Sequence, residues 1–150
     1  MAVNFTNNWK NILDKLESVI ETEFKGDLPV FKGDPVPKGV NQALQLIPVS
    51  SALSDYNTTS ETREFSIQIR FMFNEPNFSE TVLDHILRQV SRIEALIHDN
   101  TAMTLDKGSD ADNSNAFNCR FESTELNADE ESGVYVVLWE YRCQHLGNVG

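Results

Sequence analysis

Residues 65–73 read Phe-Ser-Ile-Gln-Ile-Arg-Phe-Met-Phe, and this stretch decides the fold. Large apolar side chains occupy every odd position, while serine, glutamine, arginine and methionine occupy the even positions. A period of two is typical of a β-strand, because successive side chains point to opposite faces of a sheet. The large apolar groups at odd positions therefore share one face. A second layer of structure must cover that face, since it would otherwise lie open to water.

Amphipathic helices are predicted on both sides of this strand in the sequence. In residues 8–24, apolar side chains recur every three or four positions, and Gly26 follows as a helix stop. The second helix is predicted after the alternating strand and runs to about residue 98. At its start, Asn77 and Glu80 resemble a capping box. Each helix has one apolar stripe and one charged face. Both helices are therefore predicted to pack on the sheet.

Two further stretches precede the alternating strand and carry weaker strand signals. Residues 28–39 contain three prolines and two glycines, which exclude a central strand and allow only a short edge strand at Val30 and Phe31. Residues 42–52 predict a longer strand with a bulge or break at Pro48, because proline cannot donate a hydrogen bond to a neighbouring strand.

Loops and two late strands complete the pattern. The polar residues 54–61 predict a loop, and residues 106–115 predict a longer, acidic one. Strands are predicted at 117–121, from alternation, and at 134–144, from a run of valine, tyrosine, leucine and tryptophan. An acidic connection at 127–133 is predicted to join them as an antiparallel pair.

The predicted elements follow the order α-β-β-β-α-β-β, which indicates an α+β fold. We expect a single layer of mostly antiparallel sheet, with about four to five strands, packed against the two helices. The chain has 150 residues, a length that supports one good hydrophobic core. We therefore expect one domain over residues 1–150.

The charge balance argues against several classes of function. There are 12 lysine and arginine residues against 23 aspartate and glutamate residues, which gives a net charge of −11. Specific binding of DNA or RNA is not expected, because a basic footprint for phosphates is absent. No apolar run approaches the roughly 20 residues of a membrane-spanning helix, and the first residues lack a basic and then hydrophobic leader. We expect a soluble protein that is made in the cytoplasm and binds no membrane.

The sequence carries no recognisable catalytic, cofactor or metal motif. The histidines do not fall in a metal-ligand spacing, the glycines form no phosphate-binding pattern, and the acidic loop departs from the calcium loop of EF-hands. Cys119 and Cys143 would face each other if a late hairpin paired Phe121 with Tyr141. A reducing cytoplasm favours two buried thiols there, and a disulfide is the alternative. We expect no enzymatic activity and no cofactor.

The order of elements nevertheless resembles that of a known family. An N-terminal amphipathic helix around residues 9–13, a loop rich in proline and glycine, and the alternating strand lead into a helix that contains residues 90–96. An antiparallel pair then closes the chain. Over nearly its whole length, this arrangement resembles the tail-terminator proteins of long-tailed bacteriophages, also called tail-completion or head-tail joining proteins.

The resemblance implies a structural role in the tail or neck of a virion that is assembled in the host cytoplasm. Such a protein would form a hexameric ring at the head-proximal end of the tail tube, end tube polymerisation and join the tail to the head. Its partners would be further copies of itself, the tail tube protein and the head-side connector, while DNA would only pass through the channel. The alternatives are another neck or tail-tube joining protein, and a small-ligand-binding or enzymatic α+β domain.

Two groups of charged residues are candidate sites in such a ring. The first group comprises strand arginines that could meet the acidic loops of a neighbouring subunit: Arg70, Arg120 and Arg142. The second group comprises acidic residues that could face the channel and repel DNA: Asp106, Asp110, Asp112, Glu130 and Glu131. The alternative for the arginines is that they are ordinary solvated strand residues. The alternative for the acidic residues is that they serve solubility alone.

Overall fold

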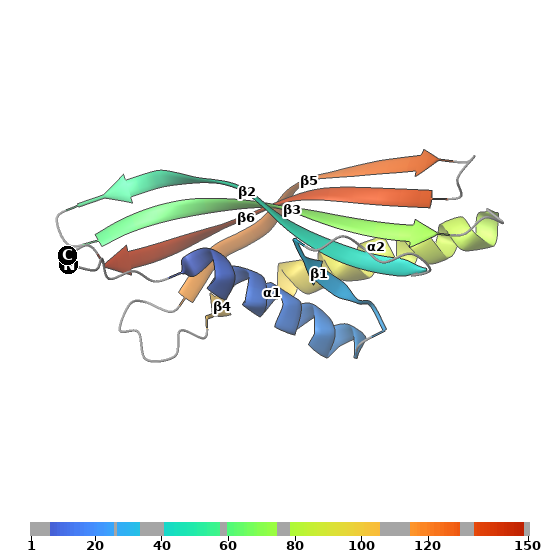
Figure 1. Ribbon diagram of the computed structural model, residues 1–150, viewed down its shortest axis with the longest axis horizontal. Coiled ribbons are helices and arrows are strands. Elements are labelled where there is room, and N and C mark those ends of the chain that lie inside the picture. Colours follow the sequence, from blue (N-terminus) through green and yellow to red (C-terminus); the bar gives the residue numbers. More distant parts are fainter. Residues whose placement is uncertain are drawn as a thin grey trace.

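The computed structural model describes residues 7–25, 27–33, 41–57, 60–74, 79–105, 115–129 and 134–148 (Figure 1). These residues form α1 (Asn8–Phe24), β1 (Val30–Lys32), β2 (Gln42–Tyr56), β3 (Ser60–Asn74), α2 (Glu80–Asp99), β4 (Met103–Thr104), β5 (Asn115–Asp129) and β6 (Val134–Asn148). The predicted α+β class and order of elements are confirmed. The sheet is 6-stranded, rather than four- to five-stranded as expected, because β4 is too short to give a sequence pattern.

The strands lie in the order β1-β2-β3-β6-β5-β4. β1 runs parallel to β2, and the other described pairs are antiparallel, as predicted. β2, β3, β5 and β6 are each 15 residues long and form the body of the sheet. The alternating stretch belongs to β3, which lies between β2 and β6 and is therefore central.

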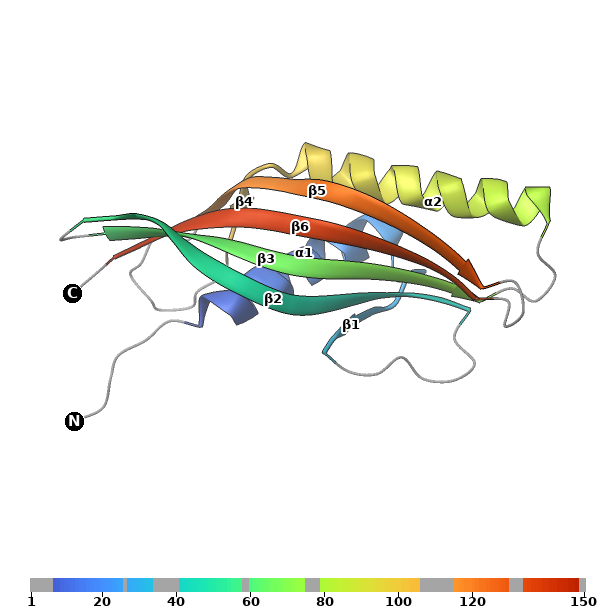
Figure 2. The ribbon, with the colours of Figure 1, turned by 90° about the horizontal axis from the view of Figure 1, so that it is seen from above.

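Both helices lie against the same face of this sheet (Figures 1 and 2). Their buried residues come from the predicted apolar stripes: Ile12, Leu16, Ile20 and Phe24 in α1, and Ile86, Val90, Ile93 and Ile97 in α2. These side chains share one hydrophobic core with alternate residues of the central strands, including Phe65, Ile67, Ile69 and Phe71 of β3 and Tyr135, Val137, Trp139 and Tyr141 of β6. The opposite face of the sheet carries no helix among the described residues.

Two predicted loops are partly wrong, because the strands extend beyond their apolar patterns. Residues 54–56 belong to β2 and residues 60–61 to β3, so much of the predicted loop is strand. Residues 127–129 likewise belong to β5 rather than to a connection. Pairing with a neighbouring strand, rather than apolar burial, holds these polar segments in the sheet.

Local sequence features explain an irregularity in β2 and the start of α2. The irregularity expected at Pro48 is confirmed as a register shift between Pro48 and Ser50. The N-cap of α2 is Ser79, whose hydroxyl accepts a hydrogen bond from the backbone N–H of Val82 at 3.3 Å. Asn77, which we predicted in this role, lies outside the described residues. Ser79 takes the role because a capping side chain stands directly before the first helical residue.

Candidate interaction surface

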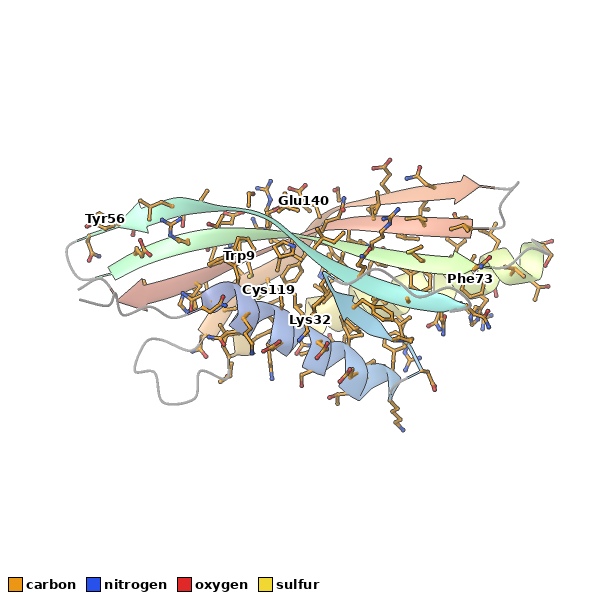
Figure 3. The ribbon with its side chains drawn as sticks, in the orientation of Figure 1. Trp9, Lys32, Tyr56, Phe73, Cys119 and Glu140 are labelled. Carbon is orange, nitrogen blue, oxygen red and sulfur yellow. The ribbon has the colours of Figure 1, made fainter. Side chains whose placement is uncertain are left out.

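The sheet face that carries no helix is the candidate functional surface, and we call it the open face. In β3 and β6 its side chains come from the even positions, most of which are half-buried. Figure 3 shows Glu140 on the open face, whereas Trp9 and Cys119 lie on the helix-covered side of the sheet. This division follows from the alternation of β3, whose odd positions enter the core.

A network of charged side chains crosses three strands of the open face. Glu64 of β3 accepts hydrogen bonds from Arg120 Nη2 at 3.1 Å and from Arg142 Nη1 at 3.3 Å. Arg142 Nη2 also donates to Glu140 Oε1 at 2.6 Å. Arg120 Nε donates to Glu122 Oε1 at 2.7 Å. Because Arg120 and Arg142 lie opposite each other in the β5–β6 ladder, the carboxylate that they share offsets the repulsion between them.

Arg70 lies apart from this network. It stands opposite Gln45 of β2 and Leu138 of β6, and its buried Nε has no hydrogen-bond partner among the described residues. Two of the predicted interface arginines, Arg120 and Arg142, thus lie together and bind carboxylates of their own subunit. The third, Arg70, keeps a hydrogen-bond donor that no described residue uses. A contact between any of them and a neighbouring subunit remains a prediction.

The acidic residues predicted to face a channel lie outside the described residues: Asp106, Asp110, Asp112, Glu130 and Glu131. On the open face, the carboxylate that joins the most partners is Glu64, which we did not single out from the sequence. The feature of the sequence that could have identified Glu64 is its position. Glu64 directly precedes the alternating stretch and shares the even parity of the polar positions, so it had to lie on the same face as Arg70.

A hollow of about 250 Å³ lies on the open face beside the network. Its lining comes from all four long strands and includes Ser66, Gln68 and Glu140. No histidine or cysteine lines it, and no group of histidine, cysteine, aspartate and glutamate side chains in the described part of the chain could hold a metal ion.

Cys119 of β5 and Cys143 of β6 are free thiols that lie buried on the helix-covered side. Their strands pair Phe121 with Tyr141, as predicted. A hydrogen bond between the two thiols lowers the pKa of Cys119 to about 7 and raises that of Cys143 above its ordinary value. Burial raises the pKa of the neighbouring Tyr141. The thiol pair therefore belongs to the core and is separate from the open face.

Two long strand edges of the sheet are open. β1 covers only three residues of the outer side of β2, and β4 covers only two residues of β5. A further hydrogen bond, from the backbone N–H of Cys119 to the carbonyl of Thr101, closes the β5 edge at that point. Beyond these contacts, residues 47–56 and 120–129 have no strand on their outer sides within the described ranges. We call these stretches the β2 edge and the β5 edge.

No helix among the described residues is long and apolar enough to cross a lipid bilayer.

Comparisons with other proteins bear on the fold. No protein-family model and no curated protein matches the sequence. The structure is similar to a chain solved in the virion of a native gene transfer agent particle, with a TM-score of 0.64. The match covers 94% of this chain and 97% of that chain at 9% sequence identity, so it shows that the two share a fold.

Proposed function

We propose that the protein is a structural component of a phage-like virion. In this proposal it forms a hexameric ring at the head-proximal end of the tail tube, ends tube polymerisation and joins the tail to the head-side connector. The observation that carries the proposal is the likeness of fold to a chain of the gene transfer agent virion, which extends over nearly the full length of both chains. The resemblance of the element order to tail terminators selects the ring among the possible virion roles.

The described surface supports a role in assembly rather than in catalysis. The hollow on the open face is lined by no histidine or cysteine, and the perturbed thiols are buried elsewhere. A ring subunit instead needs surfaces for its own copies, and head-to-tail contacts close into a ring when the rotation between subunits permits. The open face and the two open edges meet this need.

Among the three arginines, we assign Arg70 to the contact between subunits. Arg120 and Arg142 are already bound to carboxylates of their own subunit, whereas Arg70 forms no ion pair among the described residues. The acidic residues at 106–112 and at 130–131 are proposed to line the channel, where they would repel the phosphates of passing DNA. Replacing them with lysine should slow DNA ejection while rings still form.

Assembly on tail tubes tests the proposal. Light scattering over a range of concentrations, with and without Mg²⁺, would measure the mass of the protein in solution. Electron microscopy would then locate it on tail tubes assembled from the tube protein of the same virus. A ring that caps one end of each tube is the expected result. Binding along the whole tube would favour a tube protein instead, and no binding with no rings would overturn the proposal.

The assignment of Arg70 has a matched control on the same chain. Arg70→Gln should raise the concentration needed for half-maximal ring formation by about ten- to a hundredfold, because a hydrogen bond to a charged partner is worth about 1.5–3 kcal/mol. Arg88→Gln removes a similar charge from the exposed surface of α2 and should leave assembly unchanged. Equal effects of the two variants would mean that only net charge matters.

A further inference from the structure

We propose that neighbouring subunits pair edge to edge, with the β5 edge of one subunit antiparallel to the β2 edge of the next. The sheets of the ring would then join into one continuous layer of strands. This inference rests on the proposed ring and names the surface by which the ring closes. The occupant of each open edge is thus a second copy of this chain.

The first support is the state of the two edges. Unpaired strand edges expose backbone donors and acceptors, and proteins protect them with charged residues, prolines or bulges, or cover them. Residues 47–56 contain no lysine, and Pro48 and Asp55 are their only proline and charged residue; residues 120–129 contain no lysine and no proline. Large apolar side chains are exposed on both edges: Val49 at 61% and Leu53 at 50% on the β2 edge, and Leu126 at 47% on the β5 edge. A strand added to either edge would cover these side chains and satisfy the free backbone groups.

The second support is strand direction. β2, β3, β6 and β5 are neighbours in that order, and each is antiparallel to the next, so β5 runs opposite to β2. A copy related by rotation about an axis along the strands presents its β2 in the same direction as the first copy's β2. That strand is therefore antiparallel to the first copy's β5. The pairing repeats from subunit to subunit without a change of direction, which a closed ring requires.

The third support is that the two alternative edge pairings are worse. Two β5 edges facing each other would bring Glu122 and Glu125 of both copies together, and like charges across a strand pair are destabilising. Two β2 edges facing each other would leave both β5 edges open and would stop at a dimer. The mixed pairing instead sets the β5 edge against a β2 edge whose only charged residue is Asp55.

The irregularities of the two edges are compatible with a closed layer. Register shifts interrupt β2 between Pro48 and Ser50, and β5 between Phe121 and Ser123. Such bulges increase twist and bend a sheet, and they supply the curvature that closes a sheet on itself.

Two substitutions block one edge each. Leu53→Lys places a charge on the β2 edge, and Leu126→Lys places one on the β5 edge. Both side chains are about half exposed in the subunit, so neither change opens the core. Leu87→Lys on α2 is the matched control, because Leu87 is 39% exposed and belongs to neither edge strand. Circular dichroism and thermal melting would verify that all variants keep the fold of the wild type.

The expected result is specific to head-to-tail pairing. Each edge variant alone should be a monomer by light scattering, while the wild type and Leu87→Lys form rings. An equimolar mixture of the two edge variants should form a heterodimer, because one intact β5 edge meets one intact β2 edge and the other two edges are blocked. Hydrogen exchange should show that the backbone amides of residues 120–129 become protected in rings and stay open in the monomeric variants.

Other outcomes separate the two proposals. Rings that form normally from both edge variants would overturn the edge pairing and leave the proposed function standing. A dimer formed by Leu126→Lys but not by Leu53→Lys would mean that two β2 edges pair with each other. Rings that need both edges but never appear on tail tubes would overturn the tail-terminator role and leave the edge pairing standing. A wild type that assembles neither alone nor on tubes would overturn both.

Discussion

Replacing Ile69 by alanine should destabilise the protein by about 3–4 kcal/mol. Ile69 is fully buried in the middle of β3, between Leu46 of β2 and Trp139 of β6. The change removes three carbon atoms, which are worth about 0.8 kcal/mol each as buried CH₂ groups, or roughly 2.4 kcal/mol together. The cavity left behind adds about 1 kcal/mol, because strands on both sides prevent the site from collapsing. The melting temperature should fall by about 6–16 °C.

Met72→Ala is the matched control for this prediction. Met72 lies on the same strand, and its replacement by alanine also removes three heavy atoms. Its side chain is half-buried and belongs to the open face. Its loss should cost about 1 kcal/mol. Urea unfolding, followed by circular dichroism at concentrations where the protein is monomeric, would measure both values. If Ile69→Ala costs no more than Met72→Ala, then the assignment of the core to the odd face of β3 is wrong.

Four further substitutions test the charged and thiol contacts. Glu64→Gln should lower the melting temperature at low salt by about 2–4 °C, less so in about 1 M NaCl, and Glu122→Gln should have a smaller effect because it removes one ion pair instead of two. Asp14→Asn should be less stable than the wild type at neutral pH, and the difference should disappear as the pH falls below the folded pKa of Asp14. Hydrogen bonds from two lysines hold the pKa of Asp14 below its ordinary value, so its stabilisation exists above the unfolded pKa and disappears as the pH falls through the folded one. Thiolate absorbance should show that Cys143→Ala raises the pKa of Cys119 from about 7, whereas an unchanged pKa would mean that the thiols do not interact.

The parts of the fold that the sequence predicted well are those in which one face of an element is apolar. The alternation in β3 and the stripes of both helices each had a single apolar side, and that side is buried. β6 was ambiguous, because Val134 and Val136 make its even side as apolar as the odd side that carries Val137 and Trp139. Pairing with β3 determines that the odd side of β6 is buried, since Trp139 stands opposite the buried Ile69.

The candidate surface was harder to predict, because it depends on which strands become neighbours. The alternation placed Glu64 on the polar side of β3, but only the order of strands brings Arg120 and Arg142 to it from β5 and β6. The open edges likewise depend on the shortness of β1 and β4. A two-residue strand leaves no pattern in a sequence, so the extent of the β5 edge could not be inferred from it.

The pairing of β3 with β6 has a consequence for synthesis. It joins residues 60–74 to residues 134–148, so the central strand β3 pairs on one side with a strand from the last part of the sequence. Long-range pairings of this kind form slowly, and a ribosome adding roughly 5–20 residues per second needs several seconds between the two strands. A nascent chain therefore has β2 and β3 without the sheet that they belong to. The β5 edge forms only when translation is almost complete, which would limit the proposed head-to-tail association to finished subunits.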